Sequence, residues 1–262
     1  EAWPLLCGCA DPAATAAERA AARGGRAACY AQVRGQWEAV LPQQEARWSK
    51  LRERRQRVDK DVVRTDRSLP FYEGEGNANV EAMRRVLMTH VMWNWDLGYC
   101  QGMSDLLSPL LWVVGDEAEA FWCFAAVMER KGANFSHDQN GMHAQLASLR
   151  RLLGALDPGL MAHLEARGCD NLFFCFRWLL IVFKRELGWD DVMRLWEALW
   201  CHPREDFHLF VAAAVVERNR EAFAGEGLEF DELLVHVNGL AGSIDLDLAL
   251  RDAEALLAHL GG

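Results

Sequence analysis

Residues that favour β-strands are scarce in this chain. Its 262 residues include 2 Ile, 3 Thr and 18 Val, whereas Ala, Leu, Arg and Glu are abundant. β-branched side chains pack well on a pleated sheet, while Ala, Leu, Arg and Glu are among the strongest helix formers. A chain of this length buries enough surface to form one large domain or two closely associated lobes. The composition therefore predicts an all-α fold.

Apolar residues recur at helical spacing along most of the chain. In several segments the positions i, i+3, i+4 and i+7 are apolar, which is typical of amphipathic helices. Four polar residues stand where they would cap such helices, and they are Asn79, Asp116, Asp157 and Asp245. No repeat of fixed period and no polar linker divides the chain. We therefore expect one irregular, multi-helix domain, with the possibility of two lobes.

Two N-terminal segments carry more specific expectations. Residues 11–29 are rich in Ala and Arg and predict a weak helix interrupted by Gly24-Gly25. From Tyr30 to Arg57 a helical pattern runs on, and its core-facing positions are Val33, Trp37, Val40 and Leu41.

Charge and cysteine usage exclude several classes of protein. The formal net charge is 28 − 38 = −10, which argues against general nucleic-acid binding. The longest apolar stretch, residues 172–183, is too short to span a bilayer and contains Arg177. Eight cysteines stand singly, and Cys7-Gly8-Cys9 with Cys201-His202 is poor zinc spacing. We expect free thiols in a reducing cytosol, no metal site and no direct insertion into membranes.

Sequence motifs for nucleotide binding and common catalysis are absent. The chain has no G-x-x-x-x-G-K-[ST], and Gly74-Glu75-Gly76 lacks the third glycine of a dinucleotide-binding loop. The motifs G-x-S-x-G and H-E-x-x-H are missing as well. Nothing therefore predicts an independent hydrolase, kinase or dehydrogenase site.

The first segment of chemical interest is basic. Residues 43–67 hold nine Lys and Arg against five Asp and Glu, a charge of 9 − 5 = +4 in an acidic protein. One interpretation is a solvated helix face with i,i+4 ion pairs. The other is that its end presents an arginine to a phosphorylated partner. Asp61 stands three residues before Arg64, where a bidentate bond would hold the guanidinium.

The second segment is a glycine-flanked joint between two apolar stretches. Gly98 and Gly102 bracket Tyr99-Cys100-Gln101. Such a joint either places Gln101 in a cleft or makes it an ordinary hydrogen-bonding residue of a loop. Neither segment identifies a function by itself.

Together with a third segment, these two resemble the three signature motifs of TBC domains, the catalytic domains of GTPase-activating proteins for Rab GTPases. The motifs are V-x-x-D-x-x-R at 58–64, Y-x-Q-G-M at 99–103, and F-C-F-R-W at 174–178 followed by F-K-R-E at 183–186. The similarity runs from Ala2-Trp3-Pro4, which resembles the opening helix of the family, to about residue 240.

The resemblance implies an all-helical, two-lobed TBC-type domain over residues 1–262. It implies an N-terminal lobe of about residues 1–156 with both catalytic motifs, and a C-terminal lobe of about residues 157–262. Such a domain docks on a GTP-loaded Rab and accelerates its GTP hydrolysis. The domain has no cofactor of its own, because the partner carries GTP and Mg²⁺.

The resemblance also implies roles for individual residues of this chain, according to their positions within the three motifs. Arg64 and Gln101 correspond to the arginine and glutamine fingers that enter the partner's nucleotide site. An arginine supplied in trans contributes about 10³–10⁵ in rate, and a glutamine can orient the attacking water. Asp61 is expected to orient Arg64, while Tyr99, Gly102 and Asp105 are expected to shape the glutamine loop.

Two further sets of residues complete the carry-over. Arg177, Trp178 and Glu186 are expected to be architectural, because an arginine in an apolar helix needs a partner. The sequence departs from the family pattern at Val58, which replaces the usual Ile, and at Arg67, where many relatives have Pro. Arg67 is therefore a rival phosphate ligand.

Two other functions remain open. The chain is alternatively a non-catalytic scaffold of the same fold that binds a Rab, or an unrelated helical adaptor whose basic stretch binds acidic lipid or protein. For a Rab regulator we expect a cytoplasmic protein of vesicle trafficking, recruited peripherally to endomembranes through regions outside this chain. The identity of the Rab depends on surface positions outside the motifs.

Overall fold

The computed structural model describes residues 2–225 and 229–261, and within them it contains helices but no strand. The all-α prediction is confirmed. Contacts divide the chain into two compact units, residues 1–135 and 136–262. No helix of the described part is both long and apolar enough for a membrane span.

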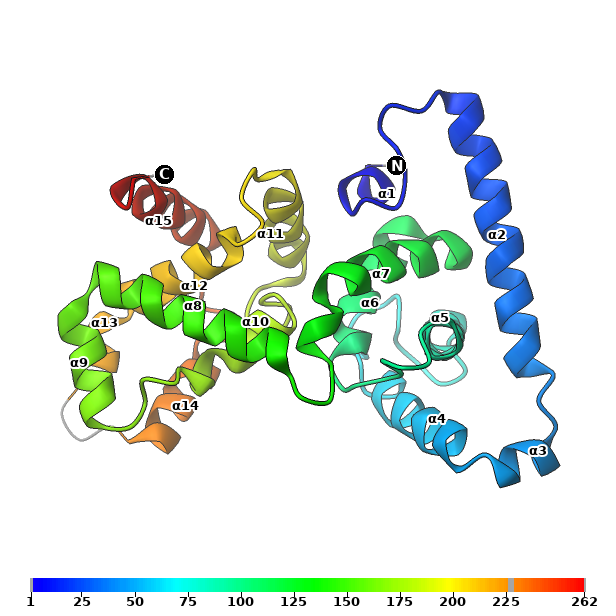
Figure 1. Cartoon of the computed structure of the whole chain (residues 1–262), viewed down its shortest axis with the longest axis horizontal. Coiled ribbons are helices and arrows are strands. Elements are labelled where there is room, and N and C mark those ends of the chain that lie inside the picture. The colour runs from blue at the N-terminus through cyan, green and yellow to red at the C-terminus, as the bar shows by residue number, and fades with distance from the viewer. Residues whose placement is uncertain (1, 226–228, 262) are drawn as a thin grey trace. The chain divides into compact units, whose positions relative to one another are not determined.

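The first unit is built around α5 (Ala78–Trp93). Helices α2, α4, α6 and α7 all contact it (Figure 1). The other elements of this unit are α1 (Trp3–Leu6), α2 (Ala16–Glu38), α3 (Pro42–Arg47), α4 (Ser49–Val62), α6 (Met103–Val114), α7 (Glu117–Lys131) and the short 3₁₀ helix η1 (Gly132–Asn134). Met83, Leu87 and Val91, spaced four residues apart on one face of α5, are all buried.

Three of the four predicted helix caps are confirmed. Asp116, Asp157 and Asp245 each accept a hydrogen bond from the backbone three residues on, at 2.8–3.0 Å. Asn79 is not a cap, because α5 begins one residue after Asn77. The side chain of Asn77 accepts the Asn79 amide at 2.8 Å, which satisfies one of the free donors of the first turn.

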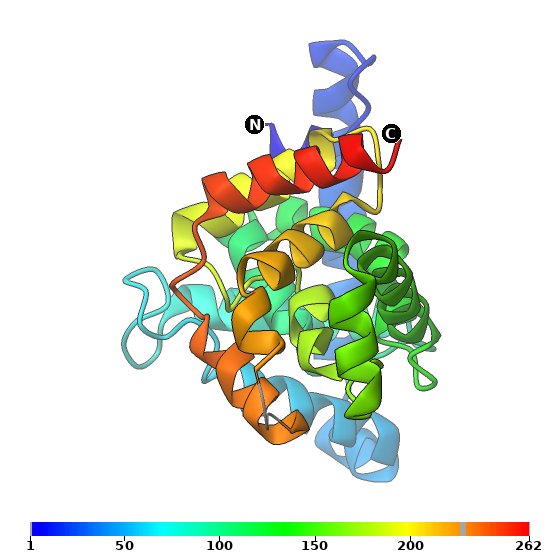
Figure 2. The ribbon, with the colours of Figure 1, turned by 90° about the vertical axis from the view of Figure 1, so that its left-hand side faces the viewer.

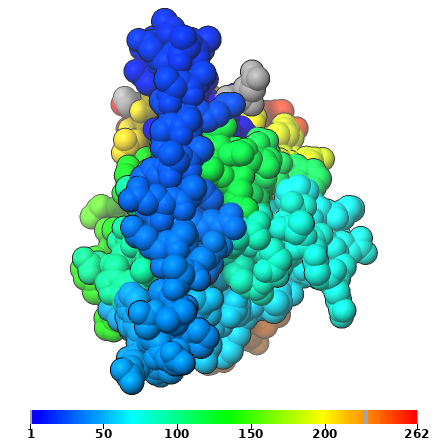
Figure 3. Space-filling view, turned by 90° about the vertical axis from the view of Figure 1, so that its right-hand side faces the viewer, coloured from blue at the N-terminus to red at the C-terminus, as the bar shows by residue number. Residues whose placement is uncertain are grey.

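Helix α2 differs from the expectation for residues 11–29, since it continues through Gly24-Gly25. Figure 3 shows α2 (blue) running along one face of its unit. Tertiary contacts hold it on both sides of the glycines: Arg23 and Arg26 pair with Glu119 on α7, and the Trp122 indole donates to the Arg26 carbonyl at 2.9 Å. These contacts offset the low helix propensity of glycine.

The helical pattern expected over residues 30–57 is broken in the structure. Helix α2 ends at Glu38 and Pro42 starts α3, as expected for a residue without a backbone N–H. The break leaves Leu41 56% exposed rather than in the core. Trp37 is buried as predicted, and its indole donates to the Thr89 hydroxyl at 3.0 Å.

The second unit is built around α12 (Phe207–Arg218), which contacts α8, α10 and α15. Figure 2 shows α15 (red) beside α12 (gold). The other elements are α8 (Asn140–Leu156), α9 (Pro158–Ala166), the 3₁₀ helix η2 (Phe173–Cys175), α10 (Phe176–Leu180), α11 (Trp189–Cys201), α13 (Arg220–Phe223), α14 (Phe230–Gly239) and α15 (Leu246–His259).

The division between the units lies earlier than the predicted lobe boundary near residue 156. Helix α8 packs on α9, α10 and α12, so it belongs to the second unit, and the division follows Phe135. The apolar face of α8 carries Met142, Leu146, Leu149 and Leu153, all of which are buried. That face needs the second unit to cover it.

Candidate functional site

The first motif forms the last turn of α4 and the residues after it. Val58 and Val62 are fully buried, so they anchor the turn in the first unit. Valine at position 58 therefore fills the apolar position that the motif requires. The next residues on the chain, Val63 and Arg64, are exposed.

Arg64 is paired with Asp61 as expected, but the geometry differs from a bidentate fork. Its Nε and Nη2 atoms donate to the same carboxylate oxygen, Asp61 Oδ1, at 3.0 and 2.6 Å. The Arg64 side chain remains 53% exposed, whereas that of Asp61 is 8% exposed. The carboxylate is thus a buried anchor for an accessible guanidinium.

The second oxygen of Asp61 explains this geometry. The Tyr99 hydroxyl donates to Asp61 Oδ2 at 2.6 Å, so only Oδ1 is left for Arg64. Tyr99 is buried, and burial followed by the hydrogen bond to Asp61 raises the pKa of its phenol. Tyr99 therefore stays a neutral donor to the carboxylate. One carboxylate links the first motif to the second.

A pair of hydroxyls makes another link between the motifs. The Thr65 hydroxyl donates to the Asp61 carbonyl at 2.8 Å and lies 3.0 Å from Ser104 Oγ. Both hydroxyl residues are buried. Each of the two residues lies one position after its motif, and neither was assigned a role from the sequence.

Gln101 lies in the loop between α5 and α6 and is exposed. The loop turns at two glycines with positive φ, Gly98 at +67° and Gly102 at +101°. Gly102 is also the N-cap position of α6. The predicted sharp joint is present, and it exposes Gln101 while Tyr99, two residues before it, is buried.

Arg54, on α4, supports this loop, a role that was not predicted from the sequence. Its Nη1 donates to the Trp95 carbonyl at 2.6 Å, and its guanidinium lies 4.2 Å from the Trp95 ring centroid. A Cβ atom at Gly98 would lie 2.5 Å from Arg54 Cζ. The guanidinium thus fills the space that glycine leaves open. Residues 43–67 contain nine Lys and Arg, and nothing in the sequence distinguished Arg54 from the others.

Asp105 and Arg67 occupy different surroundings. Asp105 is buried in the first turn of α6, where a carboxylate interacts favourably with the helix dipole. Arg67 lies in the loop after α4 and donates to the Gly74 carbonyl. Its guanidinium is therefore engaged within its own loop, whereas that of Arg64 is held beside the second motif.

The third motif lies in the second unit and forms an internal pair. Arg177 Nε donates to Glu186 Oε1 at 2.6 Å, and the Glu186 side chain is fully buried. Burial raises the pKa of Glu186, and the charge of Arg177 opposes that effect. Trp178 is fully buried and stacks on Phe183 at 5.5 Å. The partner expected for Arg177 is present.

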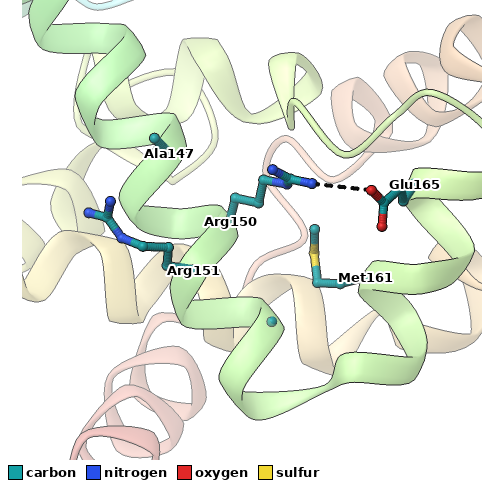
Figure 4. A pocket seen from close by; sticks show the side chains of 6 residues that line it. Ala147, Arg150, Arg151, Met161 and Glu165 are labelled. Atoms are coloured by element: carbon teal, nitrogen blue, oxygen red, sulfur yellow. Dashed lines mark ion pairs between the residues drawn. The ribbon is translucent and has the colours of Figure 1, made fainter.

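A groove between α8 and α9 contains none of the predicted site residues. It has a volume of about 390 Å³ and is lined by Ala147, Arg150, Arg151, Gly154, Met161 and Glu165 (Figure 4). Arg150 pairs across it with Glu165 at 3.6 Å and is also 2.8 Å from Asp170. Its two carboxylate partners compensate the charge of Arg150, so the groove is a weak candidate for anion binding.

Comparisons with known proteins agree with the motif assignment. The family model described as Rab-GTPase-TBC domain matches residues 1–224. Among solved structures, the Ypt/Rab-GAP domain of Gyp1p superposes with a TM-score of 0.82 at 19% identity, covering 98% of this chain and 86% of that one. The Chlamydomonas flagellar RabGAP TBC domain superposes with a TM-score of 0.73 at 21% identity, covering 99% and 79%.

Similar sequences are longer proteins. TBC1 domain family member 17 of Homo sapiens is 43% identical over 261 residues, which cover 99% of this chain and 40% of that protein. GTPase-activating protein gyp7 of Schizosaccharomyces pombe is 38% identical over 269 residues, which cover 97% and 36%. The chain thus spans about two fifths of the length of these relatives. By its family match and these identities, the chain belongs to the Rab-GTPase-TBC domain family.

Proposed function

We propose that this chain accelerates GTP hydrolysis by a Rab-family small GTPase in its GTP-bound state. Membership of the Rab-GTPase-TBC domain family supports the proposal, as do relatives named GTPase-activating proteins. The partner brings GTP and Mg²⁺, and this chain supplies side chains in trans. The setting we propose is vesicle trafficking, with recruitment from the cytoplasm to endomembranes through regions outside this chain.

The observation that carries the proposal is the position of Arg64. A buried carboxylate holds its guanidinium, yet half of the side chain is exposed and its Nη1 atom has no part in the hydrogen bonds to Asp61. Because a guanidinium carries five N–H donors, Nη1 can donate to a phosphate oxygen while Nε and Nη2 stay on Asp61. Phosphoryl transfer develops charge on phosphate oxygens, and an arginine there contributes about 10³–10⁵ in rate.

Gln101 is the second proposed catalytic residue. Its amide carries both an acceptor oxygen and two N–H donors, so it can bind the attacking water and a phosphate oxygen together. It is exposed at the tip of a loop whose flanking residue Tyr99 is tied to Asp61. This tie couples the position of Gln101 to that of Arg64.

The test is a panel of GTP-loaded Rab proteins assayed for single-turnover hydrolysis and, separately, for binding. We expect catalytic amounts of the chain to accelerate one or a few members. Binding without acceleration would replace the proposal by the scaffold function. Neither binding nor acceleration across the panel would overturn both and favour the adaptor function.

A further inference from the structure

Helix α4 has a buried side and an exposed side. It packs on α3, α5 and α6 (Figure 1), and its buried residues are Leu51, Arg54, Val58, Asp61 and Val62. Four residues at the end of its other side are exposed, and they are Arg57, Lys60, Val63 and Arg64. Each lies three or four positions from another of the four, and side chains at that spacing are neighbours on a helix surface. We call these four residues the α4 face.

The helical path continues past the last residue of α4 as far as the proposed arginine finger. Val63 keeps right-handed helical dihedral angles, and the Arg64 amide donates to the Asp61 carbonyl at 3.1 Å. At a rise of 1.5 Å per residue, Lys60 lies about 6 Å and Arg57 about 10 Å along the helix axis from Arg64. A partner that Arg64 reaches therefore also lies close to Lys60.

The charge of Lys60 is not compensated by the acidic residues beside it in the sequence. Asp59 pairs with Arg84 on α5 at 2.8 Å, and the buried Asp61 holds Arg64. Within the described residues, Lys60 takes part in no ion pair. Its ammonium group is thus available to an anion that approaches the α4 face.

Arg57 is partly compensated by an acidic neighbour. It pairs with Glu53, one helical turn earlier, at 2.6 Å, and both side chains are 59% exposed. An ion pair this exposed contributes little, because water and salt screen it. Glu53 therefore reduces the positive charge of the α4 face without removing it.

Val63 adds an apolar side chain to this charged surface. It is 57% exposed, whereas its neighbour Val62 is fully buried. A single exposed apolar residue is ordinary on a protein surface. Here it lies between Lys60 and Arg64 in the sequence, next to the proposed finger, and protein interfaces combine an apolar centre with a polar rim. The α4 face has this arrangement on a small scale.

We propose that the α4 face is a docking surface for the anionic edge of the nucleotide site on the partner GTPase. This inference rests on the proposed function. Lys60 and Arg57 attract the phosphates and the acidic side chains around them, and Val63 contacts the protein surface alongside. The distance from Lys60 to Arg64 is less than the Debye length of about 8 Å at physiological salt, so both charges act on the same anion.

A membrane fits this surface less well than a GTPase does. Segments that bind anionic lipid carry clusters of about four to eight Lys and Arg. The α4 face has three cations, of which Arg57 is paired with Glu53 and Arg64 with Asp61. The loop after Arg64 also exposes Glu73 and Glu75, which an anionic bilayer would repel.

The experiment measures kcat and KM for a GTP-loaded Rab that responds to the chain, at low and at high salt. The test variant is the double substitution Arg57→Gln with Lys60→Gln. Glutamine is chosen because a carboxylate at position 60 would lie four residues before Arg64 and compete for it. We expect KM to rise about tenfold at low salt and kcat to be kept. At high salt the difference in KM should disappear, since salt screens the lost charges.

Three single variants separate charge from packing and from folding. Val63→Ser should raise KM equally at low and high salt, because it removes an apolar contact. Glu53→Gln should lower KM by about twofold, a gain that misfolding does not produce. The matched control is Arg251→Gln on α15, which removes an exposed charge of the second unit and should leave KM unchanged.

The outcomes distinguish this inference from the proposed function. If a Rab responds and the double variant has an unaltered KM, the docking surface is refuted while the proposed function stands. If no Rab responds or binds, both are refuted. Flotation with phosphatidylserine vesicles provides the last comparison. Vesicle binding that the double variant loses, together with an unaltered KM, would assign the α4 face to a membrane and overturn the inference.

Discussion

The hydroxyl of Tyr99 donates a 2.6 Å hydrogen bond to Asp61 Oδ2, and both donating atoms of Arg64 bind Oδ1 of the same carboxylate. Asp61 belongs to the first motif and Tyr99 to the second, and the two residues are 38 positions apart in the sequence. A substitution at Tyr99 should therefore affect Arg64 indirectly, through the Asp61 carboxylate.

Replacing Tyr99 with Phe tests this link. The variant leaves the buried Oδ2 unpaired, so we expect a loss of about 1–3 kcal/mol in unfolding free energy and about a tenfold fall in Rab GTP hydrolysis. The matched control is Tyr72→Phe, which removes another buried hydroxyl, one that donates to the Ser108 carbonyl at 2.8 Å. Urea unfolding and single-turnover assays should show similar stability losses but a rate loss mainly in Tyr99→Phe. Equal rate losses would contradict a specific role for Tyr99.

Arg67→Ala should have a small effect on hydrolysis. Its guanidinium is engaged with the Gly74 carbonyl, and surface substitutions change free energies by about 0.5 kcal/mol, or roughly twofold in rate. Arg64→Lys should lose far more despite keeping its charge, because lysine lacks the planar guanidinium. Single-turnover rates of the two variants on one responsive Rab provide the measurement. A larger loss in Arg67→Ala would make Arg67 the phosphate ligand.

Gly98→Ala should destabilise the glutamine loop through Arg54. The new Cβ would lie 2.5 Å from Arg54 Cζ, and alanine at φ +67° costs about 1 kcal/mol besides. In an Arg54→Ala background only the backbone cost remains, so the same substitution should be less harmful there. A double-mutant cycle of unfolding free energies measures this coupling, and strictly additive effects would count against the contact.

His90 gives the first unit a pH dependence. Burial lowers the pKa of His90 from 6.5 to about 4, and its ring packs edge-on against Phe124. Between these values the unfolded chain binds a proton that the folded chain does not, so stability is lost as pH falls from about 6.5 to about 4. The shift corresponds to roughly 3 kcal/mol at most. Urea unfolding of His90→Gln across this pH range should show a shallower decline, and an unchanged decline would refute the assignment.

Local sequence signals predicted the elements whose causes are local. Asp116, Asp157 and Asp245 cap helices because each contacts an amide only three residues away. Helix α2 was predicted less well, because its continuity through Gly24-Gly25 depends on Glu119, more than ninety residues further along the chain. Propensity describes the isolated segment and contains no information about such partners.

The candidate site shows the same limit. The pairing of Arg64 with Asp61 spans one helical turn and was predicted, but the fork geometry was wrong because Tyr99 occupies the second oxygen. Arg54 was missed because its partners, Trp95 and Gly98, lie about forty residues away. Spacing within one helix cannot distinguish a buried arginine that supports a loop from its solvated neighbours.

We propose that Arg64 and Gln101 act together in trans on a bound Rab. The most direct measurement is single-turnover GTP hydrolysis by a responsive Rab at saturating amounts of the unaltered chain, Arg64→Ala and Gln101→Ala. We expect each variant to bind the Rab but to lose about 10²-fold or more of the acceleration. Variants that bind and match the unaltered chain in rate would contradict the mechanism.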